Sequence, residues 1–355
     1  MIANTPLLTV ITVAYNAVEF IERTILSVIA QKNVNIEYVV IDGGSSDGTI
    51  DTLKKYSEYI AFYVSEPDSG IYEAMNKGIA AATGKWMNFM NAGDTFFDEN
   101  TVHNVLLHSG GNVGVLYGDR VIEKTDGTEA YETAKNLDEF YIAMPFGHQA
   151  CFIRSDLAKA RPYDLSFKLS SDYELLLNLY HNKVDFRYIK TPVCRFLSGG
   201  LSHQRRFLSR LEAVLVASRF LNDKELIKDN VFFKGLVKDY FRQNMDVCSP
   251  VISPYLGKIF SQMHEINEKY SKVVIYGYGE VGSSFFKILG DNFVVALDTN
   301  SKLIDLPHVI HPSEVIDYEY DCIVISVLGR ESKITDYLVD ELKIDRNKLI
   351  KFSLS

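Results

Sequence analysis

Short apolar runs alternate with amphipathic stretches along the first hundred residues of the chain. The apolar runs are rich in β-branched residues and predict strands, whereas the amphipathic stretches carry apolar residues at helical spacing and predict helices. The predicted strands cover residues 7–15, 38–41, 60–64 and 86–90, and the predicted helices cover 18–31, 50–56 and 71–82. This alternation predicts βαβ units and a mostly parallel sheet, whose ligands bind beyond the carboxyl ends of the strands.

The pattern changes twice further along the chain. Amphipathic helices, interrupted by Pro250 and Pro254, are predicted from about residue 205 to 270. A second alternation of strands and helices begins at Lys272. We therefore predict an α/β protein in three parts: a large α/β domain over 1–204, a helical connector over 205–270 and a small α/β domain over 271–355.

The charge balance excludes one broad class of partner. The 355 residues are 47% hydrophobic, enough to bury a sizeable core, and 37 Lys and Arg against 46 Asp and Glu give a net charge of −9. Bulk charge of this sign does not suit nucleic acid, so we expect no nucleic-acid partner. A negatively charged small substrate would need a metal ion, a helix N-terminus or a few placed cations.

The cysteines and the length of the apolar runs indicate the compartment. Four widely spaced cysteines form no Cys-x-x-Cys pair, which argues against a zinc site or a disulfide framework and suits a reducing cytoplasm. The N-terminal apolar run has no basic segment before it, and no run in the chain is long enough to span a membrane. We expect a cytoplasmic protein without a signal peptide or transmembrane helix.

Three polar loops follow predicted strands, and each alone could be structural. The loop 42–49 suits a turn that leads into a helix, and Asp68 could cap the helix that follows it. Asp94 could likewise be a turn residue. Taken singly, none of these loops identifies a function.

Together, the order and spacing of six segments are specific. They are 10–16 (VITVAYN), 40–49 (VIDGGSSDGT), 65–78 (SEPDSGIYEAMNKG), 84–94 (GKWMNFMNAGD), 147–149 (GHQ) and 171–174 (SDYE). In this order they resemble the family 2 glycosyltransferases with the GT-A fold, most of all bacterial members that build polysaccharides. The resemblance covers about residues 6–203.

The resemblance implies a donor site for a nucleotide sugar. Tyr15 would stack on the base, Asp42 would accept hydrogen bonds from base or ribose, and Asp68 would line the nucleotide; an aromatic face and carboxylates suit these groups. His148 would contact the donor sugar or the acceptor, although a lone histidine is often structural. Asn91 is the fifth candidate substrate-binding residue.

The same resemblance implies a divalent cation, Mn²⁺ or Mg²⁺, that neutralises the departing diphosphate. The family's metal motif usually reads Asp-x-Asp, whereas the segment 91–94 here reads Asn-Ala-Gly-Asp and has one carboxylate. We assign the metal role to Asp94, with His203 from a later loop as a second candidate. One carboxylate, phosphate oxygens and waters can complete such a shell, so metal affinity without substrate should be weak.

The reaction needs a base, because the acceptor hydroxyl loses its proton as it attacks the anomeric carbon. Asp172, at the start of an apolar helical run, matches the position of the family's catalytic carboxylate. The structural alternative is a helix cap, and Glu174 is the alternative base. Family membership implies a single inverting displacement without a covalent intermediate.

The arginine-rich helix that begins near Arg205 has two interpretations. A basic amphipathic helix can lie on an anionic membrane surface, which would suit a lipid-linked acceptor. We favour the other interpretation, a helix packed on the first domain with a solvated charged face. Peripheral membrane contact remains the alternative.

The C-terminal part carries a glycine-rich fingerprint. Gly277, Gly279 and Gly282 follow a predicted strand and open a helix, and Asp298 ends the next strand. This is the context of a dinucleotide-binding loop, but only about half of a full dinucleotide fold is present. The part resembles small Rossmann-like domains attached to sugar-processing enzymes, and it could bind a dinucleotide, regulate or only pack.

We therefore predict a metal-assisted inverting glycosyltransferase. Its donor would be a nucleotide diphosphate sugar, with UDP favoured, and its acceptor a glycan or lipid-linked hydroxyl at the inner face of the membrane. Two alternatives stay open: a non-catalytic protein that binds nucleotide sugars, and an NAD-linked oxidoreductase that acts through the C-terminal part.

Overall fold

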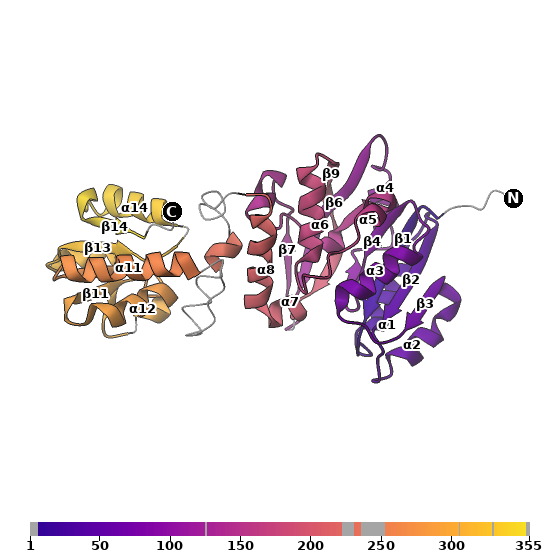
Figure 1. Cartoon of the computed structure of the whole chain (residues 1–355), viewed down its shortest axis with the longest axis horizontal. Helices are drawn as coiled ribbons and strands as arrows, with labels where there is room; N and C mark the ends of the chain where they lie inside the picture. Colours follow the sequence, from indigo (N-terminus) through magenta and orange to yellow (C-terminus); the bar gives the residue numbers. More distant parts are fainter. Residues whose placement is uncertain are drawn as a thin grey trace. The chain divides into compact units, whose positions relative to one another are not determined.

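The computed structural model describes residues 6–124, 126–221, 231–235, 253–304, 306–328 and 330–352. The chain divides into two compact units, Met1–Phe220 and Leu221–Ser355 (Figure 1). Within the predicted helical connector, residues 222–230 and 236–252 lie outside the described residues. Pro254, predicted to interrupt a helix, stands instead in the first turn of α11 (Ser253–Lys269), where a missing N–H costs nothing.

The N-terminal unit is built on one nine-stranded sheet. Its strands run in the order β3-β2-β1-β4-β8-β6-β9-β5, and β7 pairs with β6. The strands are β1 (Leu8–Ala14), β2 (Ile36–Asp42), β3 (Phe62–Ser65), β4 (Trp86–Phe89), β5 (Thr95–Phe96), β6 (Val113–Glu123), β7 (Glu129–Glu132), β8 (Cys151–Arg154) and β9 (Asp185–Leu197). The four strands predicted in the first hundred residues are present and parallel, whereas β8 runs antiparallel to both of its neighbours.

Helices of this unit connect and cover the strands. They are α1 (Ile21–Ile29), α2 (Thr49–Lys55), α3 (Ile71–Ala81), α4 (Thr101–Leu106), α5 (Ser155–Ala160), α6 (Ser171–His181), α7 (Leu201–Gln204) and α8 (Arg206–Ser218), with short 3-10 turns η1 (Ser57–Tyr59), η2 (Leu137–Tyr141) and η3 (His148–Ala150). All seven residues of β1 are buried, as expected of a central parallel strand covered on both faces.

Helix α8 packs on the N-terminal unit. Its Glu212 is buried and accepts hydrogen bonds from the backbone N–H groups of Lys168 and Leu169, at 2.8 and 2.7 Å. Ser170 donates to the Ser209 carbonyl in the same helix. Helix α8 therefore fits the prediction that the arginine-rich helix packs on the first domain. Its buried face holds the loop that precedes α6.

The C-terminal unit is a five-stranded parallel sheet in the order β12-β11-β10-β13-β14. Its strands are β10 (Val273–Tyr276), β11 (Phe293–Leu297), β12 (Val309–Ile310), β13 (Cys322–Ile325) and β14 (Leu349–Lys351). Its other elements are α12 (Glu280–Leu289), η4 (Gly290–Asn292), α13 (Ser301–Ile304), η5 (Pro312–Asp317), α14 (Glu331–Asp336), η6 (Tyr337–Glu341) and η7 (Arg346–Lys348). β11 and β12 are added on one side of the central strand β10, and β13 and β14 are added on its other side. The direction in which successive strands are added therefore reverses beside β10.

Two expectations about the whole chain can be compared with the described residues. Within them, no helix combines the length and apolar composition needed to cross a membrane. Cys151, Cys194 and Cys322 are buried and unpaired, and Cys248 lies outside the described residues.

Gly84, between α3 and β4, gives a test of this packing. A Cβ at Gly84 would lie 2.6 Å from the backbone nitrogen of Thr9, whereas a Cβ at Gly110 would meet nothing within 4 Å. We expect Gly84→Ala to lower the free energy of unfolding by about 1–3 kcal/mol, because backbone cannot move aside as a side chain can. Thermal denaturation measures the loss. Gly110→Ala is the control, and equal melting temperatures for the two variants would contradict the packing described.

Candidate functional site

Asp42 organises the loop at the end of β2. Its carboxylate is fully buried and accepts hydrogen bonds from the backbone N–H groups of Gly44 and Ser45, at 3.0 and 2.8 Å. The hydroxyls of Ser45 and Ser65 donate to it at 2.5 and 2.6 Å. Asp42 was predicted to bind base or ribose, but these donors come from the protein itself. The structure therefore shows a loop-building carboxylate, and direct contact with a ligand remains a prediction.

The turn after β1 is tied to the same loop. Asn16, with a positive φ of 46°, receives a hydrogen bond from the Ser46 N–H at 3.0 Å and donates its own N–H to Ser45 at 2.7 Å. Tyr15, beside this turn, keeps 67% of its surface exposed. A fixed backbone thus presents a free aromatic ring, as the predicted stacking on a base requires.

The side chains of Tyr15 and Asp68 both lie beside Gly43, which leaves room for them because it has no side chain. A Cβ at Gly43 would lie 2.9 Å from Asp68 Oδ2 and 3.3 Å from Tyr15 Cδ2. The other Asp68 oxygen accepts the Gly70 N–H at 2.9 Å, and Gly70, rather than Asp68, is the residue at the start of α3. Three segments far apart in the sequence therefore meet at one point, beyond the carboxyl ends of β1, β2 and β3.

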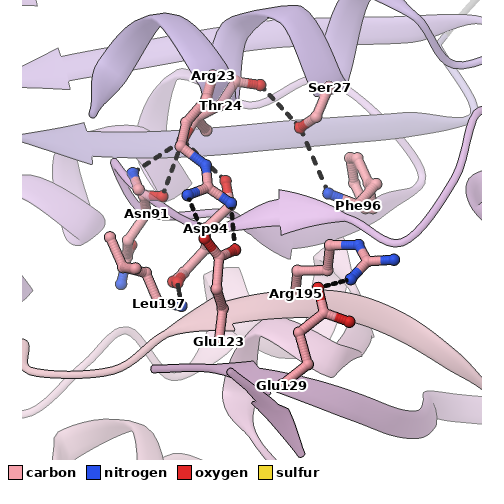
Figure 2. A network of polar contacts seen from close by, with 11 residues as sticks. Arg23, Thr24, Ser27, Asn91, Asp94, Phe96, Glu123, Glu129, Arg195 and Leu197 are labelled. Carbon is pink, nitrogen blue, oxygen red and sulfur yellow. Dashed lines mark hydrogen bonds and ion pairs between the residues drawn. The ribbon is translucent and has the colours of Figure 1, made fainter. Parts of the chain in front are cut away.

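Asp94 lies in a tight turn that α1 and β9 hold from two sides. Thr24 donates to the Asp94 carbonyl at 2.8 Å and accepts the Gly93 N–H at 2.9 Å, and the Leu197 N–H donates to Asp94 Oδ1 at 2.9 Å (Figure 2). Gln149 donates to Oδ2 at 2.9 Å. These contacts hold the turn in place, and the positive φ of Gly93, 104°, favours a glycine there.

Burial dominates the electrostatics of Asp94. The residue is 4% exposed, and this desolvation raises the pKa of its carboxyl to about 6, against the opposing hydrogen bonds from Leu197 and Gln149. A cation beside the carboxylate would favour its ionised form.

The surroundings of Asp94 suit a hard cation that is shared with a ligand. Asn91 Oδ1 and Gln149 Oε1 are buried oxygens without a hydrogen-bond donor in the described part of the chain, and oxygen is the ligand that Mg²⁺ and Mn²⁺ prefer. The described residues include no group of three or more His, Cys, Asp or Glu placed to hold a metal. His203 is exposed on α7, and its metal role remains a prediction.

Asp172 stands inside the first turn of α6, after Ser170 at the N-cap, so it is not the helix cap. Tyr72 donates its hydroxyl to Asp172 Oδ1 at 2.7 Å, and His148 Nδ1 lies 3.0 Å from Oδ2. Burial alone would raise the pKa of Asp172. The hydrogen bonds from His148 and from Tyr72 oppose burial and hold that pKa below its usual value.

A chain of polar contacts links this carboxylate to the Asp94 turn. Asn91 Nδ2 lies 3.2 Å from His148 Nε2, and the Asp94 N–H donates to the Asn91 carbonyl at 3.0 Å. The predicted residues Asn91, Asp94, His148 and Asp172 are thus brought together.

Glu174, the alternative base, is anchored elsewhere. Its side chain is 1% exposed and accepts from Arg161 at 2.5 Å and Arg219 at 3.2 Å. Both arginines hold the start of α6 in place through this carboxylate. The arrangement indicates a structural role for Glu174.

The glycine-rich loop of the C-terminal unit is closely packed. A Cβ at Gly282 would lie 2.8 Å from Ser326 Oγ, whereas a Cβ at Gly279 would meet open space. Asp298 accepts backbone N–H groups from Tyr278 and Asn300, both at 2.9 Å. Its oxygens hold the loop, and dinucleotide binding at Gly277, Gly279, Gly282 and Asp298 remains a prediction.

A hollow of this unit lies at the opposite ends of its strands, away from the glycine-rich loop. A groove of about 600 Å³ is lined by residues just before β10, β11, β13 and β14, together with the end of α11. These residues are Asn267, Glu268, Lys269, Tyr270, Ser271, Asn292, Tyr320, Asp321 and Lys348. Because the groove is at the amino ends of the strands, it is not the predicted dinucleotide site.

Comparison with known proteins identifies the N-terminal unit. The profile of glycosyl transferase family 2 matches residues 9–160. An uncharacterized glycosyltransferase of Mycobacterium tuberculosis is 34% identical over 213 residues, which cover 57% of this chain and 79% of that protein. The chain belongs to glycosyl transferase family 2.

Other relatives agree with this family assignment. The PGL/p-HBAD biosynthesis glycosyltransferase of Mycobacterium bovis is 28% identical over 58% of this chain and 84% of its own length. The mannosyltransferase PcManGT of Pyrobaculum calidifontis, solved with GDP-Man and Mn²⁺, has a similar fold with a TM-score of 0.50 at 14% identity, covering 82% of this chain and 85% of that one. The GT-A fold predicted for this family 2 glycosyltransferase is confirmed. A second profile, C2185-like, N-terminal, matches residues 269–350.

Three residues of this family 2 glycosyltransferase make contacts at the site that the sequence did not predict. Tyr72 contacts Asp172 from 100 positions away, Gln149 contacts Asp94, and Thr24 closes the Asp94 turn. Nothing in the local pattern pointed to Thr24. Tyr72 and Gln149 lie inside the segments that carry the family resemblance, which was their only signal.

The two roles of Asp42 in this glycosyltransferase can be separated. We expect Asp42→Asn to lower the free energy of unfolding by about 1–3 kcal/mol without any ligand, because the amide cannot accept all the buried donors. Thermal denaturation of the ligand-free protein measures the change. The control is Asp51→Asn on the exposed side of α2. Unchanged stability together with lost nucleotide binding would contradict the loop-building role.

Proposed function

We propose that this family 2 glycosyltransferase transfers a sugar from a nucleotide diphosphate donor, with UDP favoured, and inverts the anomeric centre. Asp172 is the base, and Tyr15, Asp42 and Asp68 belong to the donor site. The observation that carries the proposal is the hydrogen-bonded path from the Asp94 turn through Asn91 and His148 to Asp172. It links the predicted diphosphate end of the donor to the predicted base.

The acceptor is a hydroxyl of a glycan or of a lipid-linked sugar, at the inner face of the membrane. As its oxygen bonds to the anomeric carbon, the bond from that carbon to the diphosphate breaks, and the hydroxyl proton passes to Asp172. The products are the glycoside with inverted configuration and the nucleoside diphosphate. Asp172 suits this role because its side chain remains 18% exposed, whereas Glu174 is enclosed.

A divalent cation, Mn²⁺ or Mg²⁺, would supply Lewis-acid stabilisation of the leaving diphosphate. Asp94 would hold it together with phosphate oxygens of the donor, and His203 is the second candidate ligand. The oxygen-rich surroundings of Asp94 support this assignment, as does the Mn²⁺ bound to the mannosyltransferase of similar fold. Because one carboxylate is all that this turn supplies, donor and metal should bind cooperatively.

Thermal denaturation tests donor and metal together. We expect a nucleotide sugar and Mn²⁺ to raise the melting temperature only when both are present; UDP- and GDP-sugars are compared. At a hundredfold excess over the dissociation constant, the gain is about 2.7 kcal/mol. Stabilisation that EDTA does not reverse would contradict the metal role. If NADH alone stabilised the chain, the oxidoreductase alternative would gain instead.

Asp172→Asn tests the base. We expect the transfer rate to fall by about 10²–10⁴-fold while donor and metal still stabilise the variant, because proton removal is lost and donor binding is not. Release of nucleoside diphosphate in the presence of acceptor measures transfer. Asp185→Asn, an exposed aspartate at the start of β9, is the control. Transfer that survives in Asp172→Asn would exclude this residue as the base.

A further inference from the structure

We propose that Tyr72 and His148 are positioning residues that form a two-sided clamp on the base carboxylate of Asp172, and that Asn91 fixes the tautomer of His148 in which the clamp closes. That the clamp serves catalysis rests on the proposed function. The two hydrogen bonds to the Asp172 carboxylate can be tested without any substrate.

The first arm of the clamp is Tyr72 in the first turn of α3. Its hydroxyl donates to Asp172 Oδ1 at 2.7 Å, and its ring packs against that of Tyr163 at a centroid separation of 5.2 Å. Burial and the nearby Asp172 charge raise the pKa of Tyr72 well above its usual value, so this phenol keeps its proton. Because α3 directly follows the loop that holds Asp68, this arm connects the base to the predicted nucleotide side of the site.

The second arm is His148 in η3, and its tautomer follows from its two neighbours. An amide nitrogen only donates hydrogen bonds, so Asn91 Nδ2 at 3.2 Å makes His148 Nε2 the acceptor. The ring proton of the neutral imidazole is then on Nδ1, 3.0 Å from Asp172 Oδ2. Aspartate at position 91 would accept from Nε2 and favour the other proton placement.

The groups that face Asp172 come from four elements. Besides Tyr72 from α3 and His148 from η3, they are Cys151 on β8 and Tyr163 in the loop before α6. Burial raises the pKa of the Cys151 thiol and of the Tyr163 phenol, with the charge of Asp172 as a further cause, so both stay neutral. Among the described residues, the clamp therefore supplies the side-chain interactions that favour the ionised carboxylate.

The test follows the titration of Asp172 itself. The full chain is labelled with ¹³C at aspartate carboxyl groups, and the Asp172 signal is assigned from its loss in Asp172→Asn. We expect the midpoint to rise by about one to two pH units in Tyr72→Phe and in His148→Ala, since each removes a hydrogen bond to a charged group. His148→Asn should stay close to the wild type, because the asparagine amide keeps a donor near the position of Nδ1.

A matched control comes from a second buried carboxylate. Tyr188 donates to Asp119 Oδ1 at 2.6 Å, on β6, so Tyr188→Phe removes the same kind of hydrogen bond outside the proposed site. We expect it to lower the melting temperature and to leave the Asp172 titration unchanged. Midpoints that stay unmoved in both Tyr72→Phe and His148→Ala overturn the clamp. A shift in Tyr72→Phe alone overturns the role of His148.

Kinetics separate the clamp from the proposed function. With donor and metal saturating, the acid limb of the pH profile of kcat should move upward in step with the titration, and the KM for the donor should stay unchanged. A donor KM that rises with unaltered kcat would overturn the positioning role. If the wild type transfers no sugar from any donor, the proposed function fails, and the ¹³C titration still decides the clamp.

Discussion

A buried carboxylate needs hydrogen-bond donors from the protein itself, and the N-terminal unit is organised around this requirement. Five acidic side chains of the described unit are buried: Asp42, Asp94, Asp119, Glu174 and Glu212. Each accepts hydrogen bonds from another segment, so satisfying a charge also fixes a loop. Asp42 shapes the turn after β2, and Glu212 holds the loop that leads into α6. The loops of the site are ordered because these charges would otherwise be unpaired.

The same requirement separates structural carboxylates from chemical ones. Asp119 and Glu212 receive donors on both oxygens and lie outside the proposed site. Asp94 also receives two donors, yet burial raises the pKa of its carboxyl, and unpartnered amide oxygens lie beside it. Asp172 combines two donors with partial exposure. The number of donors therefore does not distinguish these carboxylates; the raised pKa of Asp94 and the partial exposure of Asp172 do.

Local periodicity predicted the four parallel strands of the first hundred residues because β1, β2 and β4 are largely buried and bounded by polar turns. The edge strand β3 is mostly exposed and was predicted from its apolar, β-rich composition alone. The remainder of the sheet was beyond such reasoning. β6 and β9 pair in parallel although about seventy residues separate them, and β8 inserts between β4 and β6. Family resemblance located Asp94 and Asp172 but not the contacts that define them, since Tyr72 reaches Asp172 across 100 positions. The sequence identified Asp42 as a site residue but did not predict its burial. A loop sequence does not show which backbone and hydroxyl donors will point at a buried side chain.

The dependence of the proposed base, Asp172, on α8 matters when domains of this protein are recombined. The change of pattern near residue 205 invites a cut there, but α8 belongs to the N-terminal unit, and its Glu212 carries the backbone before α6. A fusion joint placed before α8 would keep every proposed catalytic residue and still release the loop on which Asp172 depends. A transplanted module must therefore extend at least to Phe220 if the loop before α6 is to keep the carboxylate of Glu212.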